Sequence, residues 1–159
     1  MDMHIHDRFR GHRELRRGRV SLPGQVYHVT TTTRDRRPWF SDFHVACEAV
    51  RAFSTPLALG DAALLAWVLM PDHVHWLLQL GERLPLEAVV ARMKATSGVR
   101  ANRMLFRAGA LWTPAFHDRA LRRDEDLRTV ARYIVANPLR ARLVDRLGDY
   151  PFWNSTWLP

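Results

Sequence analysis

Residues 62–80 read AALLAWVLMPDHVHWLLQL. The first part, 62–70, is continuously apolar, which is typical of a strand that is covered on both faces. Met70-Pro71-Asp72 has the composition of a tight turn, and 73–80 has the composition of a second strand. So short a connection predicts an antiparallel hairpin. In the second strand, His73 and His75 are two residues apart and therefore project from one face, while Val74 points to the other.

The segments around this hairpin predict an α+β domain. A β-branched strand precedes it, followed by a helix that Ser41 or Asp42 can cap and that runs to about Leu59. After the hairpin come a basic amphipathic helix, a short fourth strand and a third helix that ends near Asn137-Pro138. The order predicts a ferredoxin-like βαββαβ fold, an antiparallel sheet with helices on one face. The expected bounds are 24–33, 86–106, 112–121 and a third helix starting after 124–126.

The composition favours a nucleic-acid-binding protein of one domain. The chain has 159 residues and a formal net charge of +8, and every basic residue except Lys94 is arginine. Arginine forms forked hydrogen bonds to phosphate and keeps its charge, although a GC-rich genome would produce the same bias. Cys47 is the single cysteine and has no disulfide partner, no apolar run approaches the length of a bilayer span, and residues 1–19 lack the apolar core of a signal peptide. We expect a cytoplasmic protein with a basic N-terminal arm at 1–19.

The histidine pair is a candidate metal site. Taken alone it is weak evidence, because His4-Ile5-His6 has the same spacing, and exposed histidines on a sheet are the simpler explanation. A second pair, Tyr133 and Asn137, is four residues apart on the third predicted helix, so the two side chains would share a face. Two imidazoles and an amide oxygen suit Mg²⁺ or Mn²⁺. A tyrosine packed in the core and an asparagine that ends the helix are the alternatives.

These residue types point to phosphoryl chemistry. A metal on a phosphate neutralises its charge, and a tyrosine oxygen beside it can attack phosphorus in line, giving a 5′-phosphotyrosine and a free 3′-OH. Covalent capture conserves the bond energy for rejoining. With one candidate tyrosine per chain, transfer needs another 3′-OH or a second protomer.

An ordered set of segments resembles the REP-associated tyrosine transposases, which are domesticated relatives of the single-tyrosine HUH transposases of small insertion sequences. The segments are MPDHVHW (70–76), FHDRAL (116–121) with DEDL (124–127), and YIVANP (133–138). The resemblance runs from Arg16-Arg17-Gly18-Arg19 to the tail at 149–155. It implies an HUH endonuclease fold over 20–148, a C-terminal tail at 149–159, and a nucleoid-associated protein. In that tail, Phe152 and Asn154 depart from the family's usual Tyr-x-Trp-Ser-Ser pattern.

The resemblance also implies roles for individual residues. His73 and His75 would be the HUH metal ligands, Asn137 the third ligand and Tyr133 the nucleophile. The substrates would be single-stranded palindromic hairpins with a flanking tetranucleotide, which the N-terminal Arg-Gly-Arg segment would help to recognise.

Three groups of basic residues are candidate DNA contacts. Two groups flank the first strand and can border a groove on the sheet, and the third lies on the second predicted helix and suits phosphate contacts. A solvated charged surface is the alternative for each residue. The candidates are Arg16, Arg17 and Arg19, then Arg34, Arg36 and Arg37, then Lys94, Arg100 and Arg103.

We therefore expect a metal-dependent single-strand DNA endonuclease and strand transferase that acts on REP-type hairpins, as a monomer or homodimer. Two other functions fit the same residues. One is a non-cleaving nucleic-acid-binding regulator on the same fold. The other is a metal hydrolase that activates water, in which Tyr133 has only a structural role.

Overall fold

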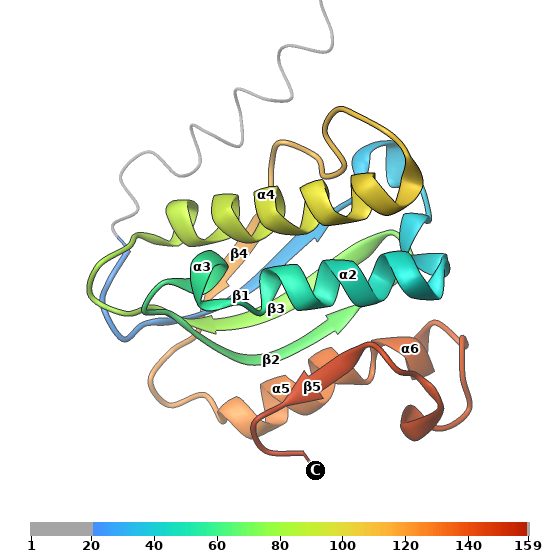
Figure 1. Ribbon diagram of the computed structural model, residues 1–159. Helices are drawn as coiled ribbons and strands as arrows, with labels where there is room; N and C mark the ends of the chain where they lie inside the picture. The colour runs from blue at the N-terminus through green and yellow to red at the C-terminus, as the bar shows by residue number, and fades with distance from the viewer. Residues whose placement is uncertain (1–20, 159) are drawn as a thin grey trace, which may run out of the picture.

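A five-stranded antiparallel sheet forms the centre of the computed structural model, which describes residues 21–158. The strand order is β4-β1-β3-β2-β5, and every pairing is antiparallel. Helices pack on the sheet (Figure 1), so the predicted α+β class is confirmed. The strands are β1 Val26–Thr32, β2 Ala63–Leu69, β3 His73–Gln79, β4 His117–Ala120 and β5 Trp153–Ser155.

Strands β2 and β3 form the predicted hairpin. Val68 lies opposite His75, and the amide of Met70 donates to the carbonyl of His73 at 2.8 Å to close the turn. Side chains of β2 pack on both faces of the sheet, since Leu69 belongs to one apolar cluster and Ala66 to the other. The prediction from the continuous apolar run is therefore confirmed: both faces of this strand are covered.

The central position of β1 determines which side chains meet the histidines. Thr30 lies opposite His75 and Thr32 opposite His73. Because strand side chains alternate between faces, His28 shares this face with Thr30 and Thr32. Tyr27 and Val29 lie on the other face, in the larger apolar cluster.

Strand β4 is shorter than predicted. The sequence favoured a strand over 112–121, but the ladder with β1 covers only His117–Ala120, and Trp112 makes an isolated bridge to Thr33. Between these points, Pro114 has no N–H for a ladder. The ammonium of Lys94 also donates hydrogen bonds to the carbonyl oxygens of residues 113–115. The segment therefore binds both Lys94 of the helix at 86–105 and single residues of β1, such as Thr32, without forming a regular ladder.

Three helices cover one face of the sheet: α2 Phe43–Phe53, α3 Pro56–Leu59 and α4 Leu86–Leu105. The Asp42 carboxylate caps α2 by accepting from the amides of His44 and Val45. The helix predicted to reach Leu59 is broken before α3, because Pro56 starts a new helix that Thr55 caps. The helix predicted at 86–106 is confirmed as α4.

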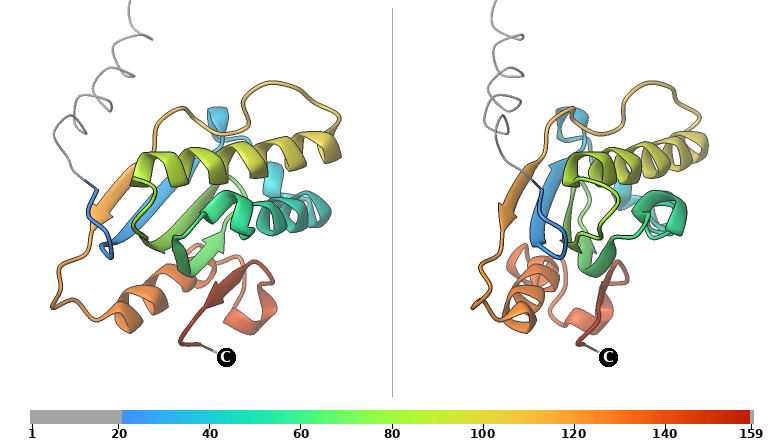
Figure 2. Two further views of the ribbon diagram at one scale, coloured as in Figure 1. Left: turned by 60° about the vertical axis from the view of Figure 1, so that its left-hand side comes forward. Right: turned by 90° about the vertical axis from the view of Figure 1, so that its left-hand side faces the viewer.

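Helix α5, Leu127–Val135, lies on the opposite face of the sheet, so the prediction of helices on one face was wrong (Figure 2). That face also carries apolar residues of the central strands, among them Val68 and Leu77, which need cover from water. Ala131 and Ile134 of α5 pack on them in the smaller apolar cluster. The helix therefore covers the same face as His73 and His75, and a short helix, α6 Asn137–Arg140, follows it.

The C-terminal tail completes the sheet. Strand β5 pairs with β2, and the hydroxyl of Tyr150 donates to the carbonyl of Leu69 at 2.6 Å. Within residues 21–158, no helix has the length and hydropathy to cross a membrane. The predicted N-terminal arm lies outside the described residues. Three short 3-10 helices complete the structure: η1 Arg34–Arg36, η2 Trp39–Ser41 and η3 Leu147–Asp149.

Candidate active site

His73 and His75 lie side by side on β3. Their ring centroids are 5.1 Å apart, with the ring planes nearly perpendicular. Val74 and Trp76, the residues that alternate with them, are fully buried on the other face. The hairpin therefore presents both imidazoles toward the side of the sheet that α5 covers, as the residue spacing predicted.

A carboxylate holds the ring of His73. Nδ1 of His73 is 2.7 Å from Oδ1 of Asp72, and the other carboxylate oxygen accepts from Arg36 at 3.5 Å. Burial alone would raise the pKa of Asp72, but the hydrogen bond and charge of His73 and the charge of Arg36 lower it below its ordinary value. An ionised carboxylate only accepts, so Nδ1 of His73 carries a proton and donates it to Asp72.

Two groups on β1 approach Nδ1 of His75. Nε2 of His28 and Oγ1 of Thr30 both lie 3.0 Å from it. Burial is the largest cause that lowers the pKa of His75, to about 3. Electrostatic repulsion from His28, His73 and Arg140 lowers it further. Burial and the charge of Arg119 lower the pKa of His28 to about 4. His28 and His75 are thus neutral at pH 7, and the neutral imidazole is the form that binds metals.

The contacts of the two rings leave Nε2 of each histidine for a ligand. In the described part of the chain, neither Nε2 has a hydrogen-bond partner, whereas Nδ1 of His73 has one partner and Nδ1 of His75 has two. Residues 21–158 contain no group of three or more His, Cys, Asp or Glu side chains arranged to hold a metal. Two imidazole nitrogens with oriented rings fit a divalent cation, provided that an amide, water or substrate oxygen completes its coordination.

Tyr133 and Asn137 do not share one continuous helix, contrary to the prediction. Helix α5 ends at Val135, and Ala136, with φ −76° and ψ 0°, separates it from α6. The reason is Pro138, which has no N–H for the carbonyl of Ile134. The amide Nδ2 of Asn137 donates to that carbonyl instead, at 3.0 Å, which leaves the Oδ1 atom of Asn137 as its remaining acceptor.

The Tyr133 side chain is 63% exposed, so it is not a core tyrosine. Within residues 21–158, no hydrogen bond joins Tyr133 or Asn137 to either histidine. Tyr133 is therefore exposed to solvent, and a bound substrate can reach it.

Arg140 was missed by the sequence analysis. Its guanidinium carbon lies 3.9 Å from the centroid of the Tyr133 ring, a cation–π contact, and its Nη1 donates to the Tyr133 carbonyl at 2.6 Å. The same positive charge contributes to the lowered pKa of His75. Arg140 thus connects the tyrosine electrostatically with the histidine pair. Its position depends on the break at Ala136, which regular helical spacing does not predict.

His28 and Asp72 were also not assigned roles from the sequence. The alternation of β1 did place His28 and Thr30 on one face, but the partner strand and its register were not predicted. Asp72 had been interpreted only as part of a turn. Its position directly before His73 was the available signal, because a carboxylate beside a histidine ligand is a common arrangement.

The predicted basic residues are divided between two places. Arg36 lies next to the histidine pair through its contact with Asp72, and Arg37 is 5.2 Å from the Trp39 ring. Arg34, Arg36 and Arg37 follow the end of β1, where Thr32 is opposite His73, so this group borders the candidate site. Arg16, Arg17 and Arg19 lie outside the described residues.

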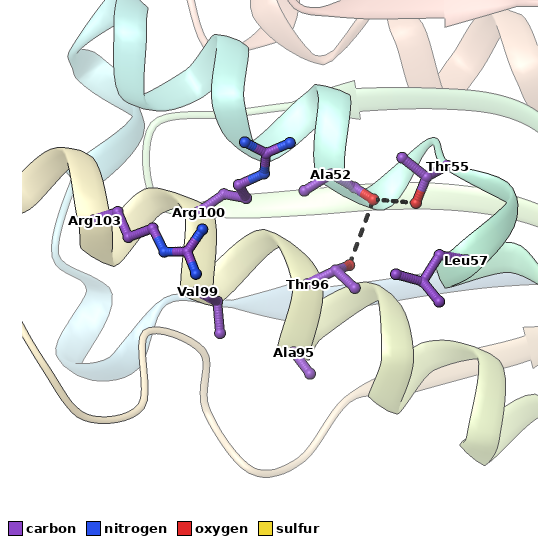
Figure 3. A pocket seen from close by; sticks show the side chains of 8 residues that line it. All are labelled: Ala52, Thr55, Leu57, Ala95, Thr96, Val99, Arg100 and Arg103. Carbon is purple, nitrogen blue, oxygen red and sulfur yellow. Dashed lines mark hydrogen bonds between the residues drawn. The ribbon is translucent and has the colours of Figure 1, made fainter.

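The other group lies on α4, which covers the opposite face of the sheet. Arg100 and Arg103 line a shallow groove of about 350 Å³ between α4 and the α2–α3 segment (Figure 3). Arg100 also pairs with Glu48 at 3.4 Å. A strand bound at the histidines would have to pass around the molecule to reach these residues.

Lys94 has a structural role that the prediction of a phosphate contact missed. Its ammonium donates to the carbonyls of Thr113, Pro114 and Ala115 at 2.5, 3.3 and 3.3 Å. These contacts use all three N–H groups of an ammonium. Burial lowers the pKa of Lys94 to about 8, so it is also a weaker fixed charge than an arginine.

Comparison with known proteins identifies a family with this architecture. A model of the family described as "Transposase IS200 like" matches residues 21–137. A REP-associated tyrosine transposase from Haemophilus influenzae is 29% identical over 140 residues, covering 81% of this chain and 78% of that protein. One from Escherichia coli is 28% identical over 92 residues, 55% of this chain and 50% of that protein. A solved structure of a REP-associated tyrosine transposase bound to a REP hairpin has a TM-score of 0.66 at 22% identity, covering 85% of this chain and 79% of that one.

Proposed function

The chain belongs to the IS200-like transposase family, and on this basis we propose that it is a DNA-processing enzyme which cuts and rejoins single-stranded DNA through Tyr133. The observation that carries the proposal is the combination of an exposed tyrosine on α5 with two oriented imidazoles on the sheet face that α5 covers. A metal-binding pair and a hydroxyl nucleophile are the parts that a phosphoryl transfer needs.

In this proposal Nε2 of His73 and Nε2 of His75 hold a divalent cation, Mg²⁺ or Mn²⁺, with Oδ1 of Asn137 as the third protein ligand. The cation would neutralise negative charge on the scissile phosphate. Asp72 accepts from Nδ1 of His73 and orients its ring, and the buried setting keeps His75 neutral, so His75 does not have to lose a proton to bind the ion near pH 7.

The covalent step transfers a phosphoryl group to Tyr133. The phenolic oxygen forms a bond to phosphorus, the bond from phosphorus to the 3′ oxygen breaks, and the phenolic proton passes to solvent while the leaving oxygen becomes a 3′-OH. Attack of a 3′-OH on the phosphotyrosine reverses this step and rejoins the strands. Arg140, which contacts the Tyr133 ring, would place a permanent positive charge beside the phosphate.

The proposed substrate is a single-stranded DNA hairpin of the REP type with a flanking tetranucleotide. Support comes from the solved relative that is bound to a REP hairpin. Arg34, Arg36 and Arg37 border the site and are the proposed DNA contacts among the described residues, and Arg16, Arg17 and Arg19 keep the role predicted from the sequence. Arg100 and Arg103 belong to this set only if DNA extends around the molecule to α4. One nucleophile per chain is compatible with either a monomer or a homodimer.

A covalent-capture experiment tests the proposal. Labelled hairpin oligonucleotides with a randomised four-nucleotide flank are incubated with the protein and Mn²⁺, and denaturing gels are examined for a protein–DNA adduct. We expect an adduct with the wild type and none with Tyr133→Phe. Tyr27→Phe is the matched control, because Tyr27 is buried on the other face of the sheet. Sequencing of the captured DNA would identify the flank.

The same experiment separates the two other functions. Cleavage by the wild type without an adduct, or by Tyr133→Phe at an undiminished rate, would indicate a hydrolase that activates water. Tight hairpin binding without any cleavage would indicate a non-cleaving regulator.

A further inference from the structure

We propose that His28 is a positioning residue that fixes the tautomer and ring orientation of His75, so that Nε2 of His75 faces the metal. This inference rests on the metal site in the proposed function. Its evidence is separate, because it comes from the contact between β1 and β3.

The geometry joins the two imidazoles through specific atoms. Nε2 of His28 is 3.0 Å from Nδ1 of His75, and the ring centroids are 5.2 Å apart at an interplanar angle of 36°. His28 pairs with Leu77 in the β1–β3 register, so it reaches His75 diagonally across the two strands. A diagonal neighbour at this distance is within reach of a long side chain.

The chemistry of a histidine ligand requires such a partner. An imidazole that binds a metal through Nε2 carries its proton on Nδ1, and that N–H needs an acceptor. Thr30 also lies 3.0 Å from Nδ1, and its hydroxyl can accept from the same N–H. An imidazole can also donate or accept, so the proposal includes the tautomer of His28: with its proton on Nδ1, its Nε2 has only a lone pair, which accepts from the Nδ1–H group of His75.

The position of His28 suits a residue that contacts a metal ligand better than it suits a third ligand of the metal. Its Nε2 is directed at Nδ1 of His75, whereas the metal would bind to Nε2, on the other side of that ring. The arrangement parallels that of His73, whose Nδ1 contacts the Asp72 carboxylate. Each histidine ligand then has a ring partner or a carboxylate on its Nδ1 atom: the Asp72 carboxylate for His73, and the His28 imidazole, beside the Thr30 hydroxyl, for His75.

Two measurements test the proposal with three variants. His28→Leu removes the acceptor, His28→Gln restores an amide oxygen, and His44→Leu is a control on α2, on the opposite face of the sheet. Long-range proton–nitrogen NMR of the metal-free protein gives the tautomer of His75. Electron paramagnetic resonance of Mn²⁺ gives the dissociation constant, and circular dichroism confirms that each variant is folded.

We expect the Nδ1–H tautomer of His75 in the wild type. His28→Leu should weaken Mn²⁺ binding by about 10-fold to 100-fold, the range typical for partners of histidine ligands, and His28→Gln should recover part of this loss. The proposal is overturned if His75 carries its proton on Nε2 in the wild type, if folded His28→Leu binds Mn²⁺ as tightly as the wild type, or if the nitrogen of His28 is itself coupled to bound Mn²⁺. The tautomer measurement needs neither metal nor DNA. Absence of a covalent adduct would therefore count against the proposed function and leave this inference standing.

Discussion

Replacement of Asp72 measures how much a single carboxylate contributes to the candidate metal site. In the structure, Oδ1 of Asp72 lies 2.7 Å from Nδ1 of His73, and the Asp72 side chain is 29% exposed. Asp72→Asn keeps the shape and an acceptor oxygen but removes the charge. Asp72→Ala removes the acceptor as well, and His73 then loses the group that orients its ring.

The expected magnitudes follow from the kind of hydrogen bond that is lost. A hydrogen bond to a charged group contributes about 1.5–3 kcal/mol and one between neutral groups about 0.5–1.5 kcal/mol. The difference, about 1–1.5 kcal/mol, predicts that Asp72→Asn weakens metal binding by about 5-fold to 10-fold, since each 1.4 kcal/mol is about tenfold. Asp72→Ala should cost about 10-fold to 100-fold.

Isothermal titration calorimetry with Mn²⁺ near neutral pH measures these changes. Arg36→Gln is the control, because Arg36 contacts the other carboxylate oxygen at 3.5 Å and its side chain is 64% exposed. An exposed pair of this kind contributes about 0–1 kcal/mol, so the control should change the affinity little. If Asp72→Ala binds Mn²⁺ as tightly as the wild type, the carboxylate does not orient a ligand and the reasoning is refuted.

Three further predictions concern other parts of the molecule. Arg140→Gln should slow formation of the Tyr133 adduct by about 100-fold without weakening Mn²⁺ binding, as measured by single-turnover capture; an unchanged rate would exclude Arg140 from the reaction. In metal-free protein, the free energy of unfolding measured in urea should decrease as the pH falls below about 6.5. The unfolded chain then takes up protons on His28 and His75, which the folded chain resists until their lowered pKa values of about 4 and about 3; greater stability at pH 5 than at pH 7 would contradict this. Lys94→Met should lower the free energy of unfolding by about 1–3 kcal/mol, because three carbonyls lose their donor. It should leave the salt dependence of hairpin binding unchanged; a slope smaller by about one would instead identify a phosphate contact.

Much of the fold could be predicted because its causes are local. The turn at Met70-Pro71-Asp72 and the strands on either side of it predict a hairpin from neighbouring residues alone, and the pairing of Val68 with His75 confirms it. The placement of His73 and His75 on one face follows from the two-residue period of a strand. Where a local signal competed with a distant contact, the prediction failed. In the strand expected from residue 112, Pro114 interrupts the ladder and Lys94, a residue of α4, binds the carbonyls of 113–115.

The sequence by itself determined the chemical groups of the candidate site, namely two histidines on one strand face, a tyrosine and an asparagine. Only the tertiary structure decided what surrounds them. The pairing of β1 with β3 brings His28 to His75 across 47 residues of sequence. Helix α5 packs on the apolar side chains of the second face of the sheet. The helix break at Ala136 brings Arg140 to the Tyr133 ring. These contacts depend on strand register and on the burial of two separate faces, which are properties of the packed chain and are not encoded in the spacing of residues within one segment.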